Sequence, residues 1–426
     1  MALELNDTHD PARRSWLDSA NVAGTEFPIQ NLPFGLFKTQ GSAPRGGVAL
    51  GDRIIDLSKL ADRLGDAARA ASGDTIAPLI EQSPHALSAL RAALSALYRS
   101  DTTDRAIAET ALVPMVEAEL LLPLKPVAFT DFCCSIDHIR RMADISGRPI
   151  APCADRLPVG YNSRASSVAV SGTPVVRPNG QYEFPPASGT LHYAPERRLD
   201  YELEFGVWLR GGNALGQPIS VADAEAMMVG CSLVNDWSAR GIQFFESMLG
   251  PHLGKSFMTT VSPWIVTMEA LAPFRVPPRG RAADEPPVIA HLLDADDRAS
   301  GGIQIAMHAD LSTATSGPVR ICTTGFETMF WTLAQMVAHQ ASSGAPIETG
   351  DLIGSGTVSG PAEEAKACLA EYNQRGTNPV LFPDGAKRLW LEDGDTMTIT
   401  AMAHADGFVP IGFGPCSGTV YPAAAG

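Results

Sequence analysis

The chain has 426 residues, of which 45% are hydrophobic and 19% charged, and its formal net charge at pH 7 is −15. This length is sufficient for two or three domains with real cores, and the composition is that of an ordinary globular protein. The acidic balance, with no stretch dense in Lys or Arg, argues against a nucleic-acid partner.

The sequence shows no evident membrane span, secretory signal or disulfide framework. No apolar run approaches the roughly 20 residues that a membrane-spanning helix needs, and MALELNDTHDPARRS lacks the basic-then-apolar order of a secretory signal. The seven cysteines are an odd number without a CxxC pair, which fits reduced thiols better than a disulfide framework or a zinc site. We therefore expect a cytoplasmic protein with neither a membrane nor a nucleic-acid partner.

Residues 1–118 predict a small α+β accessory domain. It begins with a loose polar arm of about 22 residues, followed by β-rich segments in which Gly51-Asp52 lies between two apolar runs and predicts a hairpin turn. Ser83-Pro84 is a helix start signal, and leucines then recur at helical spacing at positions 87, 90, 94 and 97. A shorter helix is expected over residues 101–112.

Residues 119–426 predict a larger β-rich domain, beyond a proline-punctuated connection at 121–129. Short apolar runs between Gly and Pro turns predict strands at 166–172, 199–211, 287–297 and 396–403. Helices are expected at 221–228 and 326–341, and an exposed loop at 273–287. The pattern favours a sandwich or rolled sheet over a regular βαβ series.

Four carboxylates lie in otherwise apolar segments. Glu202 and Glu204 are two apart in LDYELEF, so in a strand they point to one face. An ordinary solvent face of an edge strand would explain that pair by itself, but Asp236 follows MMVGCSLV and Asp131 lies in VAFTDFCC. Buried carboxylates need a positive partner, and an all-oxygen site suits Mg²⁺, Ca²⁺ or Mn²⁺.

Basic and polar residues supply the remaining chemistry. His138, seven residues after Asp131, is a candidate general base because histidine titrates near neutrality; an exposed loop histidine is the alternative. Arg240, Gln243 and Lys255 could hold an oxyanion, or form salt bridges to the acidic residues, or do both. The glycine-rich segment 350–361 could bring backbone N–H groups near a ligand, but it lacks the lysine and spacing of a phosphate loop.

Taken together, the motifs resemble the fumarylacetoacetate hydrolase family in its full-length, two-domain form. The similarity runs from FPIQNLPFGLF to DGFVPIGFGPCSG and is most specific at LPVGYNSRASSVAVSGTPVVRPNGQ, VNDWSARGIQ, LGKSFMTTVSPW and GSGTVSGP. The resemblance implies a small SH3-like N-terminal domain (1–118) and a larger mixed β-sandwich roll (119–426), associating as a homodimer.

The resemblance also implies site residues. The metal ligands would be Asp131, Glu202, Glu204 and Asp236, with Lys255, Thr259 and Gly356 lining the same metal site. His138 would be the water-activating base and Glu371 the carboxylate that orients it. Oxyanion and leaving group would be held by Arg240, Gln243 and Lys255, and the substrate would be bound by Tyr161, Arg148, Arg240, Gln243 and Thr357.

Two positions depart from the family pattern. Ser247 stands where the family has a tyrosine, four residues after Gln243, and one residue is deleted nearby. The arginine for the substrate carboxylate is out of register: Arg148 is the nearest match, one position late, with Arg140 and Arg141 as rivals. Both departures concern substrate anchoring.

The implied reaction is metal-dependent hydrolysis of a carbon–carbon bond in a 1,3-diketo acid, foremost 4-fumarylacetoacetate to fumarate and acetoacetate, the last step of tyrosine and phenylalanine breakdown. Mg²⁺ or Ca²⁺, and less readily Mn²⁺, would be the cofactor. Three alternatives stay open: a hydrolase of another acylpyruvate or diketo acid, an oxaloacetate-type decarboxylase, and a catalytically silent protein with a structural Ca²⁺ site.

Overall fold

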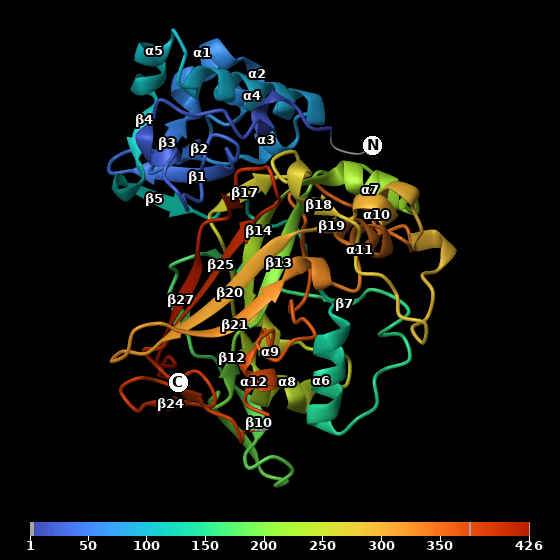
Figure 1. Ribbon diagram of the computed structural model, residues 1–426. Helices are drawn as coiled ribbons and strands as arrows, with labels where there is room; N and C mark the ends of the chain where they lie inside the picture. The colour runs from blue at the N-terminus through green and yellow to red at the C-terminus, as the bar shows by residue number, and fades with distance from the viewer. Residues whose placement is uncertain (1–3, 375, 426) are drawn as a thin grey trace.

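The computed structural model describes residues 4–374 and 376–425, which form a sheet-rich mixed fold with an N-terminal domain and a larger C-terminal domain (Figure 1). In the N-terminal part, β1 pairs with β2 and β5, and β3 joins β2 to β4. These strands are β1 (Phe34–Thr39), β2 (Arg45–Leu50), β3 (Arg53–Asp56), β4 (Leu112–Pro114) and β5 (Ala118–Leu121). The predicted hairpin at Gly51-Asp52 is confirmed, because it joins β2 to β3.

The helices of this part lie against one side of its strands (Figure 1). The longest, α4 (Pro84–Tyr98), begins where the sequence predicted, with the Ser83 side chain accepting a hydrogen bond from the amide of Ala86. The others are α1 (Ala61–Leu64), α2 (Asp66–Ala70), α3 (Ala77–Ile80) and α5 (Arg105–Thr110).

From residue 4 onward the N-terminal arm is docked rather than loose, so that prediction is wrong there, and residues 1–3 lie outside the described residues. The short helix η1 (Asp7–His9) buries Thr8 and His9. The His9 ring contacts the carbonyl of Glu269 at 2.8 Å, which lies in the C-terminal part of the chain. Polar side chains made the segment look solvated, but the buried side chains of Thr8 and His9 both have hydrogen-bond partners.

A single large sheet crosses both domains, in the order β4-β3-β2-β1-β17-β14-β13-β22-β6-β7. Its link is the antiparallel pairing of β1 with β17 (Trp264–Thr267). The boundary at residues 118/119 stays a prediction, and the pairing of β5 with β1 extends the strands of the first part to Leu121. The remaining members are β6 (Phe129–Cys133), β7 (Val159–Asn162), β8 (Val168–Val170), β13 (Leu203–Leu209), β14 (Met228–Asp236), β16 (Thr259–Val261) and β22 (Leu352–Gly354).

A second sheet has the order β21-β20-β25-β27-β9. Buried and half-buried residues alternate along β20 (Ile305–Ser312) and β25 (Thr396–Ala403), as expected for strands with one face on a core. Its other strands are β9 (Val175–Val176), β21 (Val319–Gly325), β26 (Ile411–Gly412), which pairs with β25, and β27 (Cys416–Tyr421). The inner faces share one hydrophobic core with Val207, Leu233 and Ile399.

Helices of the C-terminal part frame the ends of these strands (Figure 1). They are α6 (Ile136–Ser146), α7 (Val221–Met227), α8 (Arg240–Glu246), α9 (Leu253–Ser256), α10 (Ala295–Ser300), α11 (Leu333–Gln340) and α12 (Leu369–Tyr372). Small two-stranded pairings join β10 (Asn179–Glu183) to β11 (Leu191–Pro195) and β12 (Leu199–Asp200) to β15 (Ser238–Ala239).

Three predicted elements differ from the structure. The expected exposed loop at 273–287 includes the buried Phe274 and the strand β18 (Arg275–Val276), which pairs with β19 (Gly302–Ile303). The expected strand over 287–297 is instead the short helix η7 (Ala290–Leu292) followed by α10. The Asp294 side chain accepts hydrogen bonds from the amides of Asp296 and Asp297, and this N-cap stabilises a helix start. The helix expected from residue 326 begins only at Leu333, where Thr332 and Gln335 form a capping box.

Within the described residues, no helix combines the length and apolar character needed to cross a membrane.

Candidate active site

Four buried carboxylates converge at one end of the large sheet. Glu204 lies on β13, Asp236 ends β14 and Asp131 lies on β6, while Glu202 directly precedes β13. β13 lies between β14 and β22, and β22 pairs in turn with β6, so strand order brings the three segments together. One oxygen of each carboxylate lies within 4.8 Å of the others. The grouping predicted from the sequence is therefore present in space.

Several of these oxygens have no hydrogen-bond partner among the described residues. Both carboxylate oxygens of Glu204 and Oδ1 of Asp131 are buried and unpartnered. Burial and the charge of Asp236 raise the pKa of Asp131, and burial together with Asp131 raises the pKa of Glu204. Such an arrangement is unfavourable without a compensating positive charge.

The backbone leaves room beside these oxygens. A Cβ atom at Gly354 would lie 2.7 Å from Oδ1 of Asp131 and 3.2 Å from Oε2 of Glu204, so only glycine fits at this position. Oxygen ligands of this kind are those that hard divalent cations bind. The residues therefore fit a divalent cation held by the four carboxylates.

Cations of the chain flank the other side of the cluster. Lys255 Nζ contacts Oε2 of Glu202 and lies 2.7 Å from Oδ2 of Asp236. Arg240 Nη2 lies 2.8 Å from Oε1 of Glu202. Burial would lower the pKa of Lys255, but Asp236 and Glu202 outweigh burial and raise it, so Lys255 is held as an ammonium. Arg240 and Lys255 therefore form salt bridges to the acidic residues, which was one of the two roles expected for them.

Tyr161 and Thr259 complete the hydrogen bonding around the cluster. The Tyr161 hydroxyl lies 2.6 Å from Oδ2 of Asp131 and 3.0 Å from Oδ2 of Asp236. Thr259 donates to Oδ1 of Asp236 at 2.8 Å. Thr259, predicted to line the metal site, and Tyr161, predicted to bind the substrate, both contact the carboxylates directly.

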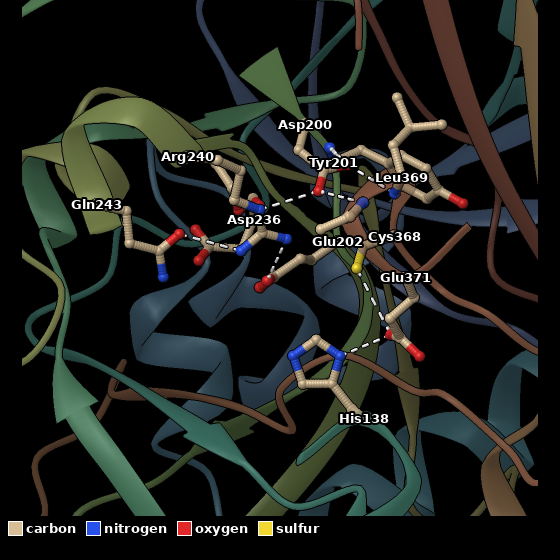
Figure 2. Close-up of polar contacts among 12 residues, drawn as sticks. His138, Asp200, Tyr201, Glu202, Asp236, Arg240, Gln243, Cys368, Leu369 and Glu371 are labelled. Carbon is tan, nitrogen blue, oxygen red and sulfur yellow. Dashed lines mark hydrogen bonds and ion pairs between the residues drawn. The ribbon is translucent and has the colours of Figure 1, made fainter. Parts of the chain in front are cut away.

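The second polar group is the pair His138 and Glu371, shown in Figure 2. Nδ1 of His138, in the first turn of α6, lies 2.6 Å from Oε1 of Glu371, on α12. Glu371 is 1% exposed, and the Ser359 hydroxyl donates to the same oxygen at 2.6 Å. Burial would raise the pKa of Glu371, but His138 and these hydrogen bonds lower it. The carboxylate is therefore ionised and its orientation is fixed.

Glycine-rich residues 354–360 lie between the two groups. Gly356 has φ +75°, and a Cβ there would lie 2.2 Å from the carbonyl oxygen of Phe132, so glycine is required at this close approach. Thr357 is buried beside it at 2% exposure. The segment thus follows β6 closely, between Asp131 and His138.

Asp200 is a site residue that the sequence analysis missed. Its carboxylate is fully buried and accepts hydrogen bonds from Nε of Arg240 at 2.9 Å and from the amides of Leu369 and Ala370 at 2.7 and 3.0 Å. Asp200 therefore ties Arg240 to the first turn of α12, which carries Glu371 (Figure 2). Its place two residues before Glu202, in the same alternation, was the available signal.

The candidate substrate arginines are placed differently from one another. Arg148 is exposed, just after the Gly147 cap of α6. Arg140 is half exposed and pairs with Glu285 at 3.2 Å. Arg141 donates to Oε2 of Glu371 at 3.1 Å.

Residues after Arg240 form the outer edge of the site. Arg240 Nη1 donates to Oε1 of Gln243 at 3.0 Å, which directs the amide of Gln243 toward the guanidinium. Ser247, at the end of α8, is exposed, and its hydroxyl reaches only the carbonyl of Phe244, at 3.3 Å. Among the described residues, the Ser247 hydroxyl therefore takes no part in the hydrogen bonding of the carboxylates.

Residues 128–421 match the family described as "Fumarylacetoacetate (FAA) hydrolase C-terminal", and residues 30–123 match "Fumarylacetoacetase N-terminal". The chain belongs to the fumarylacetoacetate hydrolase family. This family assignment confirms the resemblance inferred from the motifs.

Curated members of the fumarylacetoacetate hydrolase family are similar over nearly the full length. The fumarylacetoacetase of Oryza sativa subsp. japonica is 37% identical over 428 residues, covering 96% of this chain and 97% of the relative. The human fumarylacetoacetase is 37% identical over 416 residues, covering 94% and 97%.

A solved structure supports the fold. The fumarylacetoacetate hydrolase from psychrophilic Exiguobacterium antarcticum superimposes with a TM-score of 0.51 at 16% identity, covering 92% of this chain and 99% of that chain. This chain thus shares the fold of a solved fumarylacetoacetate hydrolase.

Proposed function

We propose that the protein hydrolyses a carbon–carbon bond in a 1,3-diketo acid, converting 4-fumarylacetoacetate and water into fumarate and acetoacetate. The observation that carries the proposal is the pairing of two unlike groups: a cluster of buried carboxylates, in which oxygens of Glu204 and Asp131 lack a hydrogen-bond partner among the described residues, lies beside a completed histidine–carboxylate pair. The full-length similarity to curated fumarylacetoacetases supports the choice of substrate.

The first group would hold a divalent cation, with Asp131, Glu202, Glu204 and Asp236 as its ligands. When bound, the cation supplies a Lewis acid that polarises the diketone oxygens and stabilises the negative charge of the leaving carbon. Mg²⁺ or Ca²⁺ is proposed, with Mn²⁺ as a further candidate, because all the ligand atoms are oxygens.

The second group activates water. Because Glu371 accepts a hydrogen bond from the Nδ1–H group of His138, the Nε2 lone pair is free to take a proton from water. The hydroxide attacks one carbonyl carbon and the adjacent carbon–carbon bond breaks. The leaving carbon takes up one proton, so that one water is consumed for each acid and ketone formed.

The cations of the site act on the charges that develop. Arg240 and Lys255 are fixed by buried carboxylates before substrate arrives, so they are preorganised donors for the oxyanion. Gln243 is oriented by Arg240 and adds an amide donor at the outer edge. Tyr161, Thr357 and Arg148 are proposed to contact the substrate, and Lys255, Thr259 and Gly356 to line the cation site.

Hydrolysis of another acylpyruvate or diketo acid is the second candidate, and Ser247 favours it. The exposed serine cannot replace a tyrosine hydroxyl as a substrate anchor. An assay over a panel of acylpyruvates and fumarylacetoacetate, with cations added back after chelation, tests both candidates. The highest kcat/KM should fall on fumarylacetoacetate, and a higher value for a different diketo acid would replace that substrate assignment.

We further propose that the protein works as a homodimer in the cytoplasm. Light scattering coupled to size-exclusion chromatography should give twice the chain mass of 45.0 kDa, and a monomer mass would exclude the dimer. Fractionation of the native cells should recover the protein with cytoplasmic markers, and recovery in another fraction would exclude this location.

A further inference from the structure

Two side chains of α6, one helical turn apart, contact the carboxylate of Glu371. His138 Nδ1 lies 2.6 Å from Oε1 of Glu371, and Arg141 Nη1 donates to Oε2 at 3.1 Å. Residues i and i+3 lie on one face of a helix, so His138 and Arg141 contact the two oxygens of Glu371 from the same face of α6. The carboxylate therefore cannot rotate without losing one of these contacts.

The two oxygens of Glu371 are supported unequally. Oε1 receives the Ser359 hydroxyl at 2.6 Å and lies 3.5 Å from the Cys368 thiol, in addition to His138. Among the residues that the structure describes, Arg141 is the side chain that donates to Oε2. Glu371 is buried, and a buried carboxylate oxygen without a donor is costly and favours protonation.

Arg141 is itself held in place. Its Nη2 donates to the carbonyls of Gly360 and Ala362 at 2.8 and 3.0 Å. The planar guanidinium thus joins α6, α12 and the end of the glycine-rich segment, which the single ammonium of a lysine cannot do as well. Both of its terminal nitrogens are directed at protein acceptors rather than at the substrate space.

We propose that Arg141 is a positioning residue of the reaction: it keeps Glu371 ionised and aligned on His138, and it does not bind the substrate carboxylate. The inference rests on the proposed function of the same site. It assigns a role to a residue whose sequence position had suggested substrate anchoring instead.

The kinetic test compares Arg141→Met with Arg140→Met. Arg140 is the preceding residue of α6 and is half exposed against Glu285, so its variant is the matched control. Arg141→Met should lower kcat about tenfold, by analogy with the low end of the loss seen for hydrogen-bond partners of metal-ligating histidines, with KM within about twofold of wild type. Arg141→Lys, which keeps a charge near Oε2, should recover part of kcat, and Arg140→Met should match wild type.

A double-mutant cycle separates positioning from substrate binding. In a Glu371→Gln background, Arg141→Met should cause little further loss of kcat, because Arg141 acts through Glu371. A raised KM in Arg141→Met, or an undiminished effect in the Glu371→Gln background, would overturn the proposal in favour of substrate anchoring.

A spectroscopic readout keeps the test independent of catalysis. In ¹⁵N-histidine NMR at alkaline pH, with His138→Gln used for assignment, the wild type and Arg140→Met should show His138 with its proton on Nδ1. Arg141→Met should show a mixture of the two neutral tautomers, and an unchanged Nδ1–H form would overturn the proposal. If no diketo acid is hydrolysed but the NMR result holds, the proposed function fails and the positioning role of Arg141 survives.

Discussion

The site contains two sets of buried carboxylates with opposite electrostatics. Glu204 and Asp131 have oxygens without a hydrogen-bond partner in the described part of the chain, and burial with like charges raises their pKa values. Glu371 is equally buried, yet His138, Ser359 and Arg141 donate to its oxygens and its pKa is lowered. Glu204 and Asp131 therefore need an external cation, whereas Glu371, like Glu202 beside Lys255 and Arg240, is compensated by the protein itself.

The difference follows from where the side chains originate. The cluster is carried by neighbouring strands of one sheet, whose backbone amides are already used in pairing and cannot serve the carboxylates. Glu371 and Asp200 lie at or against the first turn of α12, where side chains and free amides are available. The strands therefore present carboxylate oxygens that are free to bind a cation, here called the open set. The residues around the start of α12 instead complete the hydrogen bonding of Glu371 and Asp200, here called the closed network.

The largest expected effect is on the open set. Exhaustive chelation should abolish hydrolysis, and Glu204→Gln should abolish it even with Mg²⁺ or Ca²⁺ present. In chelator, Glu204→Gln should unfold at a higher temperature than wild type, because a like-charge repulsion is removed. At about 100-fold excess of cation over its Kd, wild type should gain about 2.7 kcal/mol in the free energy of unfolding, and the variant should gain less. Turnover that survives chelation would contradict the metal assignment.

Removing the proposed general base, His138, should affect catalysis without affecting cation binding by the open set. His138→Ala should lower kcat by about 10² to 10⁴, the usual contribution of a general base. Its cation-dependent rise in melting temperature should equal that of wild type, because His138 is not among the four ligands. Steady-state kinetics and thermal melts with and without cation measure both. Near-normal kcat, or a lost cation response, would break the division of roles.

Removing the charge of Asp200 tests how much the ion pairs of the closed network contribute to stability. Asp200→Asn should lower the free energy of unfolding by about 3–5 kcal/mol, because it leaves the buried Arg240 without one of its paired carboxylates. Urea unfolding followed by fluorescence gives this value. A variant as stable as wild type would mean that Glu202 alone compensates Arg240.

The smallest effect concerns a buried carboxylate remote from the site. Burial raises the pKa of Asp297 to about 6, above an unfolded value near 3.9. The folded state therefore binds the proton more tightly, and this residue destabilises the protein increasingly as pH rises from about 4 through 6. Asp297→Asn should raise the free energy of unfolding by up to about 3 kcal/mol at pH 7.5 and by less at pH 5. The gain should not depend on added cation, and a larger gain at pH 5 would reverse the sign argument.

Local patterns predicted several elements well. Alternation in TMTITAMA predicted β25 with its observed bounds, and Ser83-Pro84 predicted the first residue of α4. The expected strand at 287–297 was wrong because apolar residues in VIAHLL fit either a strand or a helix. There the Asp294 cap decided in favour of helix. α12 has four residues, too few for any periodicity to reveal it.

The sequence by itself determined which side chains are chemically suited to the site: acidic residues in apolar runs, a histidine nearby, and the motifs of a family. It could not determine which of them meet. His138 and Glu371 are 233 positions apart, and strand order within the sheet, not spacing along the chain, brings Asp131 beside Glu204. The position of Arg141 was likewise decided by tertiary structure. Any surface arginine of α6 could suit a substrate carboxylate, and only the packing of α12 against that helix directs this one to Glu371.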